Sequence, residues 1–289
     1  MHDNPQANSA TTFALSDHRV ISIAGRDAVA FAQAQFMNDV GALMPGNWQW
    51  NGWLTPKGRV IALFALLRID DENVWLLLPD ADPAAMAAAL QRFVFRSKVT
   101  ISNRHDLGVT GCFNAPDAAS GPLIGGGMPG AIEIDMGANG GPRCLRIGSD
   151  LANNDSAMVA RWTALDLCHG LPRLPASQVE RWTPQQLSLE RLHGFSVKKG
   201  CYPGQEIVAR THFLGTAKRG LALFEADAPL EAGAEVFVGD ASLGLVVSTA
   251  SLAARHLGLA VLPRDRTAAA LTSGGNPLRE LPIADGLAR

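Results

Sequence analysis

The sequence predicts an α+β protein made of two mixed modules of strands and helices, followed by a small β-barrel. Over residues 13–105, short β-branched runs alternate with apolar stripes at helical spacing. This alternation partly recurs over residues 106–214. Beyond residue 215 only short strands separated by Gly, Pro and Asp remain, a pattern typical of a small barrel. With 289 residues, 47% of them hydrophobic, the chain can bury a sizeable core.

The first module is predicted to run in the order strand, helix, strands, helix, strand. Gly25 and Asp27 open the first helix, in which Phe31 lies on an apolar stripe. Asp82 and Pro83 supply an N-cap and a first-turn proline for the second helix, which we expect to reach about residue 95. The expected strands cover residues 19–23, 48–54, 59–69, 73–78 and 98–102. This order fits a ferredoxin-like unit.

The second module contains a loop rich in glycine and proline, residues 121–142. GGGMPG within this loop matches G-x-G-x-x-G, but it precedes a strand-like stretch, AIEIDM, and opens no helix, which argues against a nucleotide site. The expected elements are strands at 107–112 and 144–147, a helix from about Leu151, and barrel strands at 220–224, 235–238, 242–248 and 258–262. We expect a disordered tail over 1–12, two interleaved modules over 13–214 (roughly 13–105 and 106–214), and the barrel over 215–289.

Charge and residue usage exclude several classes of protein. A net charge of −2 excludes a wholly basic nucleic-acid-binding chain, although six Lys or Arg residues face a single acid between residues 191 and 219. The four cysteines form no C-x-x-C pair and the histidines never pair at i, i+4, so we expect no stable metal site. The first dozen residues lack a signal peptide's apolar core, and the longest apolar run is far shorter than the roughly 20 residues that span a bilayer. We therefore expect a cytoplasmic protein.

The segment KKGCYPGQEIVAR, residues 198–210, is the strongest candidate for chemistry. Pro203 and the two glycines make a tight turn around Cys201. Neighbouring positive charges stabilise a thiolate, the form that attacks electrophiles or binds metal. The alternative is a buried cysteine at a sharp turn, since free cysteine is often a small core residue. The residues alone leave both interpretations open.

Two further predictions concern residues near this motif. We predict a strand over residues 205–212, which places Glu206, Val208 and Arg210 on one side. Glu206 then either pairs with Arg210 to brace the loop or binds a ligand. Trp162 begins an apolar stretch, WTALDLCHGLP, and is either a core residue or a platform that stacks on a flat heterocycle.

The motif K-G-C-Y-x-G-Q-E followed by a hydrophobic pair and Ala-Arg resembles the YgfZ group of folate-binding proteins. These are relatives of the glycine-cleavage T-protein, an aminomethyltransferase. Other segments carry the resemblance across most of residues 13–262: Gly25-x-Asp27-Ala28 with FAQAQFMNDV, then PKGRVIALF, KRGLALF and ASLGLVVS. In the second segment Met37 stands where threonine is usual.

The resemblance implies an α+β fold in which three modules form a ring around a central channel that holds a reduced folate, tetrahydrofolate or a derivative. It also implies a role in maintaining iron–sulfur enzymes, including those that thiolate tRNA. The functional motif residues it implies are Cys201 and Lys199, with Tyr202, Gly204, Gln205, Glu206 and Arg210. The implied folate contacts are Trp162, His18, Asn38 and Gln205. His18 replaces a tryptophan of the family, and Cys168 replaces an acidic residue.

Two functions follow as hypotheses. The first is a folate-dependent accessory factor that supports assembly or repair of iron–sulfur enzymes through Cys201. The second is a tetrahydrofolate-dependent aminomethyltransferase, but T-proteins carry an acidic pair where this chain has Ala62 and Leu63. The expected partners are reduced folate and iron–sulfur enzymes or their assembly factors. We expect a monomer without membrane contact, and without stable nucleic-acid binding because no RNA-binding signature is present.

Overall fold

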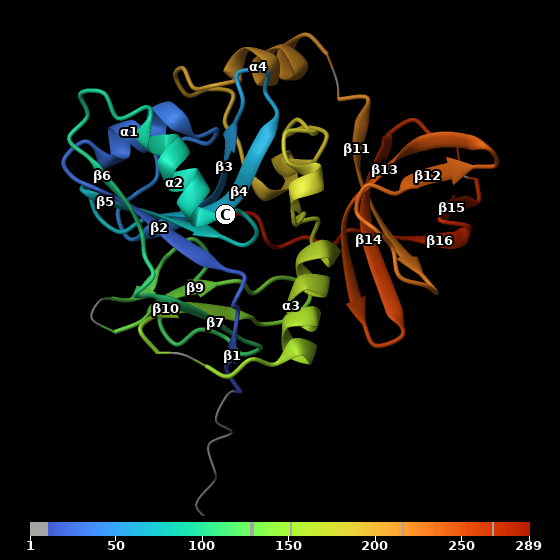
Figure 1. Ribbon diagram of the computed structural model, residues 1–289, viewed down its shortest axis with the longest axis horizontal. Coiled ribbons are helices and arrows are strands. Elements are labelled where there is room, and N and C mark those ends of the chain that lie inside the picture. Colours follow the sequence, from blue (N-terminus) through green and yellow to red (C-terminus); the bar gives the residue numbers. More distant parts are fainter. Residues whose placement is uncertain (1–10, 128–129, 151, 216, 268) are drawn as a thin grey trace, which may run out of the picture.

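The computed structural model describes residues 11–127, 130–150, 152–215, 217–267 and 269–289. Nearly all of the expected N-terminal tail, and the centre of GGGMPG, lie outside these residues. The described chain forms two five-stranded antiparallel sheets and a closed six-stranded antiparallel barrel (Figure 1). The sheets are stacked, the barrel lies beside them, and one long helix runs between sheets and barrel. No helix in the described part of the chain is long and apolar enough to cross a membrane.

The first sheet has the strand order β3-β4-β5-β2-β6. Its strands are β2 (Arg19–Ala24), β3 (Asn47–Leu54), β4 (Val60–Arg68), β5 (Asn73–Leu78) and β6 (Thr100–Asn103). The run β6-β2-β5-β4 has the ferredoxin-like arrangement that the sequence predicts, with β3 added at one edge. Helices α1 (Ala28–Gln35) and α2 (Pro83–Gln91) cover one face of this sheet.

Local chemistry explains where α2 begins and ends. The Asp82 carboxylate accepts hydrogen bonds from the backbone N–H groups of Ala84 and Ala85, and Pro83 occupies the first turn, as predicted. The helix ends at Gln91, short of the expected residue 95. Phe95 lies beyond it, 85% exposed, so no apolar contact extends the helix that far.

The second sheet combines segments from distant parts of the chain. Its strand order is β1-β7-β10-β9-β8, with β1 (Phe13–Ala14), β7 (Gly108–Cys112), β8 (Gly125–Gly126), β9 (Ile132–Asp135) and β10 (Cys144–Gly148). Strand β1 pairs with β7 before the chain enters the first sheet, so the two modules share strands. The expected helix near Leu151 begins later, because Asp155 caps α3 (Ser156–Cys168).

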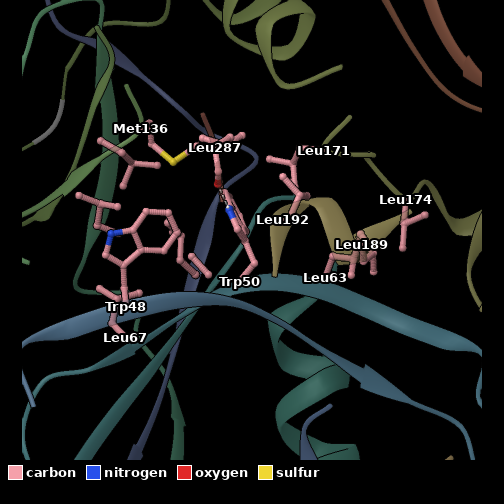
Figure 2. Close-up of a cluster of buried hydrophobic side chains, with 14 of the residues drawn as sticks. Trp48, Trp50, Leu63, Leu67, Met136, Leu171, Leu174, Leu189, Leu192 and Leu287 are labelled. Carbon is pink, nitrogen blue, oxygen red and sulfur yellow. Dashed lines mark hydrogen bonds between the residues drawn. The ribbon is translucent and has the colours of Figure 1, made fainter. Parts of the chain in front are cut away.

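Alternating side chains on the first sheet face two different cores. In β4, Phe64 and Leu66 pack toward α1 and α2, while Ala65 and Leu67 face the second sheet. The core between the sheets also receives Trp48, Trp50, Trp75, Ile134 and Leu145. This inter-sheet core is rich in tryptophan and forms the centre of the molecule (Figure 2).

The barrel contains the four strands that the sequence predicts and two that it did not. The strands are β11 (Arg219–Ala226), β12 (Glu235–Val238), β13 (Ala241–Leu252), β14 (Arg255–Pro263), β15 (Leu271–Ser273) and β16 (Asn276–Leu281). β15 and β16 are short and mostly polar, so their apolar alternation is weak. The chain after β16 leaves the barrel and runs back to the centre of the molecule (Figure 1).

Candidate functional site

Cys201 lies on the surface, in a turn that leads into helix α4 (Gln205–Phe213). The prediction of a strand over 205–212 was wrong. Gly204, with φ of 82°, begins a helix of nine residues in which only Val208 is buried. With so few buried positions, alternation and helical periodicity cannot be told apart in the sequence.

The helix changes the interpretation of Glu206 and Arg210. Both side chains are exposed and lie one turn apart on α4, and among the described residues they form no ion pair with each other. A negative charge in the first turn and a positive charge in the last turn each stabilise a helix through its dipole. Helix α4 thus replaces the strand face on which both residues were predicted to lie.

The turn around Cys201 is held against the segment PKG by two glycines. A Cβ atom on Gly204 would lie 2.6 Å from the carbonyl oxygen of Thr55 and 2.7 Å from the Cα of Gly58. Gly58 has φ of 68°, and a Cβ there would lie 2.8 Å from the Cβ of Ile207. The two motifs PKGR and CYPGQE are therefore in direct backbone contact, which requires glycine at both positions.

Lys199 is buried beside the end of α1. Its Nζ donates hydrogen bonds to the carbonyl oxygens of Gln33 and Phe36, each at 2.5 Å, and of Asn38 at 3.0 Å. Burial lowers the pKa of Lys199 to about 8, and the Asp39 carboxylate opposes that shift. The three protons of the ammonium are thus used by backbone carbonyls. Lys199 fastens the Cys201 turn to the C-terminus of α1.

Tyr202 and Gln205 complete the support of the turn. The Tyr202 hydroxyl donates to the carbonyl oxygen of Ser196 at 3.1 Å, and burial raises its pKa to about 12. Its ring lies 4.9 Å from Nζ of Lys199. The Gln205 side-chain amide donates to the carbonyl oxygen of Lys199 at 3.2 Å. Cys201 is therefore an exposed thiol on a turn whose neighbours are buried and hydrogen-bonded.

Asn38 lies close to Lys199, and its side chain is hydrogen-bonded within the protein. Its side-chain amide donates to the carbonyl oxygens of Trp50 at 2.9 Å and His193 at 2.6 Å, and its own oxygen accepts from the Asp39 N–H. The buried side chain thus joins the segment after α1 to β3 and to His193. Its amide and its oxygen are already used within the protein.

Trp162 lies in the core on α3 and is fully buried. Its ring packs edge-on against Phe13 at 6.0 Å and faces the Arg143 guanidinium at 4.8 Å. Its indole N–H has no hydrogen-bond partner among the described residues. The flat group that Trp162 meets here is an arginine of this chain.

His18 lines a small cavity between the two sheets. The cavity has a volume of about 20 Å³. Its lining is His18, Trp50, Ala65, Leu77, Pro79, Ile134, Met136, Leu145, Asp166 and Leu171. A space of this size holds little more than one water molecule. The structure thus places His18 in this central cavity, apart from Cys201, Lys199 and Asn38.

The four cysteines differ in their exposure to solvent. Cys112 and Cys144 are buried, Cys168 is half-buried, and all four cysteines are free. Within the described residues, no group of three or more His, Cys, Asp or Glu side chains could hold a metal ion. Cys201 is the one exposed thiol of the four.

The chain is similar along most of its length to proteins described as tRNA-modifying protein YgfZ. The homologue of Cronobacter sakazakii is 30% identical over 234 residues, covering 73% of this chain and 70% of the relative. The chain belongs to the YgfZ family. The Vibrio vulnificus YgfZ is 28% identical over 270 residues, covering 85% of this chain and 82% of the relative. No family model matches the chain.

This YgfZ-family chain has the fold of a glycine-cleavage T-protein. The crystal structure of aminomethyltransferase T from Bartonella henselae matches 96% of this chain and 85% of that protein, with a TM-score of 0.73. The sequence identity is 13%, so the match concerns the fold alone. The mixed α+β architecture with a closed barrel near its end is thus confirmed.

Sequence reasoning missed Asp166, an acidic residue of the YgfZ chain that lines the central cavity. Its carboxylate lies 2.7 Å from Nη1 of Arg143 and 3.7 Å from Nη1 of Arg173. Asp166 is 1% exposed. One signal was present, since a single carboxylate interrupts the apolar stretch WTALDLC. The prediction considered only Cys168, two positions later, as the site of an acidic residue.

Proposed function

We propose that this YgfZ-family protein is a folate-binding accessory factor that supports assembly or repair of iron–sulfur enzymes, including enzymes that modify tRNA. Its reacting group is Cys201. The observation that carries the proposal is an exposed thiol on a turn fixed by the buried residues Lys199 and Tyr202. Relatives that match most of the chain are named as tRNA-modifying proteins.

The geometry of the turn suits a thiol that meets large partners. Cys201 is accessible, while the backbone on both sides is held by hydrogen bonds from Lys199 and by the contact between Gly204 and Gly58. After the thiol loses its proton to solvent, its thiolate supplies one ligand to a cluster. One ligand is too few to keep a cluster, so the client protein provides the others. The Cys201 turn would then pass a cluster to the client protein and would not store it.

We place the folate in the centre of the molecule, at the cavity between the two sheets. The cavity there combines an indole, an imidazole and a carboxylate, from Trp50, His18 and Asp166. A pterin ring offers a flat face for the indole and N–H donors for the carboxylate. Trp162 is separated from this space by its own packing in the core. The chemical groups that line the cavity suit a pterin, but the cavity must become larger before it can hold one.

An aminomethyltransferase is the second candidate, favoured by the fold shared with aminomethyltransferase T. In this chain, however, Ala62 and Leu63 occupy the two positions of the T-protein acidic pair, and both are buried among apolar side chains. No carboxylate at these positions can orient an amine or stabilise developing charge. We expect no transfer of a one-carbon unit from an aminomethyl-lipoyl donor to tetrahydrofolate.

Substitution of the thiol tests the proposal. In a cell lacking the protein, Cys201→Ala is expected to abolish rescue of iron–sulfur enzyme activity and of tRNA thiolation. The fold is expected to persist, because exposed substitutions usually change stability by less than about 0.5 kcal/mol. Cys168→Ala, which removes a half-buried thiol on α3, is the matched control and should rescue. Full rescue by Cys201→Ala would overturn the role of the thiol.

Folate binding is measured separately. Purified protein is titrated by calorimetry with tetrahydrofolate and with its 5-formyl and 5-methyl forms. We expect Cys201→Ala to bind with unchanged affinity, since the thiol is not among the residues that line the central cavity. A wild-type protein that binds none of the three compounds contradicts the folate assignment.

A further inference from the structure

The chain that follows the barrel, residues 282–289, lies in the centre of the molecule. It leaves β16 and runs as an irregular segment to the centre of the molecule, where it contacts β3 (Figure 1). Leu287 from this segment is 1% exposed and packs in the inter-sheet core, where Figure 2 shows it over Trp50 and beside Met136. We call residues 282–289 the strap.

The end of the strap makes specific contacts with two of the three tryptophans of β3, Trp48 and Trp50. The indole Nε1 of Trp50 donates a hydrogen bond of 2.8 Å to the carbonyl oxygen of Leu287. The Arg289 guanidinium lies 5.6 Å from the ring of Trp48 and donates to the carbonyl oxygens of Asp135 and Gly137, at 3.0 and 2.8 Å. These contacts close the space between the sheets at this side.

The earlier part of the strap is held by several contacts outside any strand pairing. The N–H of Ala284 donates to the carbonyl oxygen of Cys168 at 2.8 Å, Arg191 donates to the carbonyl oxygens of Ile283 and Ala284, and Ile283 packs against the core between α3 and the barrel. Arg191 forms an ion pair of 2.6 Å with Asp285, whose side chain is 83% exposed. The N–H of Asn139 donates to the carbonyl oxygen of Asp285, and Gly286 has φ of 96°. No residue of the strap belongs to a strand or helix. Release of the strap therefore breaks no sheet, and exposed ion pairs contribute little to holding it.

The position of the strap conflicts with a ligand in the centre. Trp50 and Met136 line the central cavity, whose volume is about 20 Å³, and Leu287 packs against Trp50 with Met136 beside it. A pterin needs many times the volume of one water molecule. The core around the cavity is close-packed, so space arises most easily where a segment without regular structure can leave.

We propose that the strap is an autoinhibitory segment that occupies the ligand site of this protein and is displaced when a reduced folate binds. This inference rests on the proposed folate function. The ring of the ligand takes the place of Leu287 against Trp50, and the freed indole N–H donates to an acceptor of the ligand. Ligand affinity is then reduced by the fraction of molecules in which the strap is seated.

The test compares four proteins in calorimetric titrations with 5-formyltetrahydrofolate: the full chain, Leu287→Asp, a chain ending at residue 281, and the control Pro282→Ala, which alters an exposed strap residue. If the strap is seated in nine of ten molecules, its release lowers Kd by about tenfold. We expect this change in Leu287→Asp and in the shortened chain, and no change in Pro282→Ala. Thermal unfolding shows whether each variant is folded. If either Leu287→Asp or the shortened chain fails to fold, the Kd of the other one tests the proposal.

Hydrogen exchange of the full chain gives an independent readout. Saturation with 5-formyltetrahydrofolate is expected to speed exchange of backbone amides in residues 283–289, while amides of β4 keep their protection. If all four proteins bind with equal Kd, or if exchange in the strap is unchanged at saturation, the autoinhibitory role of the strap is wrong, but the folate proposal is unaffected. Absence of binding in all four overturns the folate proposal and with it the gating role of the strap.

Discussion

At the scale of single residues, Cys201 and Lys199 have opposite surroundings although they are two positions apart. The thiol is exposed, whereas the ammonium is buried against the carbonyl end of α1. The sequence places both in one motif and favours an ammonium that activates the thiol. The structure instead gives Lys199 three backbone partners. We infer that Lys199 acts on Cys201 mainly as a positioning residue.

Lys199→Met tests this positioning role. The variant leaves three carbonyl oxygens of residues 33, 36 and 38 without their donor, and we expect the free energy of unfolding to fall on the order of 2–4 kcal/mol. Lys198→Met is the matched control, because Lys198 is exposed, and it should change stability by less than about 0.5 kcal/mol. Urea denaturation measures both. Equal stability of the two variants would contradict the positioning role.

At the scale of elements, helix α4 depends on a close approach between two loops. Gly204 starts the helix with a left-handed backbone, and its Cα faces Gly58 of the turn between β3 and β4. This contact ties PKGR to CYPGQE and fixes where Cys201 is presented. A side chain at either glycine separates the loops.

Gly204→Ala is expected to lower stability by roughly 2–4 kcal/mol, because the added Cβ meets Thr55 and Gly58 and the positive φ disfavours alanine. Gly200→Ala is the matched control within the same motif, since a Cβ there meets nothing within 4 Å. Thermal and urea unfolding of the two variants should separate them clearly. A Gly204→Ala protein as stable as Gly200→Ala would show that the loops can move apart freely.

At the scale of the whole molecule, a network of charges joins the two sheets to α3. Arg173 donates to Asp80 at 2.7 Å and to Asp17 at 2.6 Å, and it lies 3.7 Å from Asp166. Asp166 also pairs with Arg143 at 2.7 Å. Removing one partner of a buried pair leaves the other charge uncompensated. The network thus holds the segments before β2, after β5 and after α3 in one arrangement.

Acid is expected to weaken this network through Asp17. Burial alone would raise the pKa of Asp17, but hydrogen bonds and charges of His18 and Arg173 outweigh it and lower the pKa below its usual 3.8. Because the folded-state pKa is lower than the unfolded one, the stabilisation by Asp17 is present above about pH 4 and is lost as the pH falls further. Asp17→Asn should therefore be less stable than the wild type at pH 7.

The same variant should also lose less stability than the wild type between pH 5 and pH 3, because it lacks the titrating group. Asp240→Asn, at an exposed position of the barrel, serves as control and should follow the wild type. Urea midpoints at the two pH values measure the difference. Identical pH dependence of Asp17→Asn and the wild type would assign the acid sensitivity to other carboxylates.

Prediction from the sequence succeeded where local patterns were long or chemically distinctive. The apolar run of β4, the Asp82–Pro83 start of α2 and four barrel strands follow directly from periodicity and capping. It failed at α4, where only Val208 is buried, and at β15 and β16, which are too short to show a pattern. For the site, the motif around Cys201 was identified, but Asp166 and Leu287 were not.

The sequence by itself determined the α+β class, the family resemblance and the glycine-rich turn of KKGCYPGQE, because these depend on residue type and on neighbours along the chain, whereas the exposure of Cys201 came from the structure. Only the tertiary structure decided that Lys199 caps α1, that Trp162 packs in the core, and that residues 282–289 return to the centre beside Trp50. These facts rest on contacts between segments more than a hundred residues apart. Local propensity carries no information about such contacts, since burial and hydrogen-bond partners arise only when the distant segments pack together.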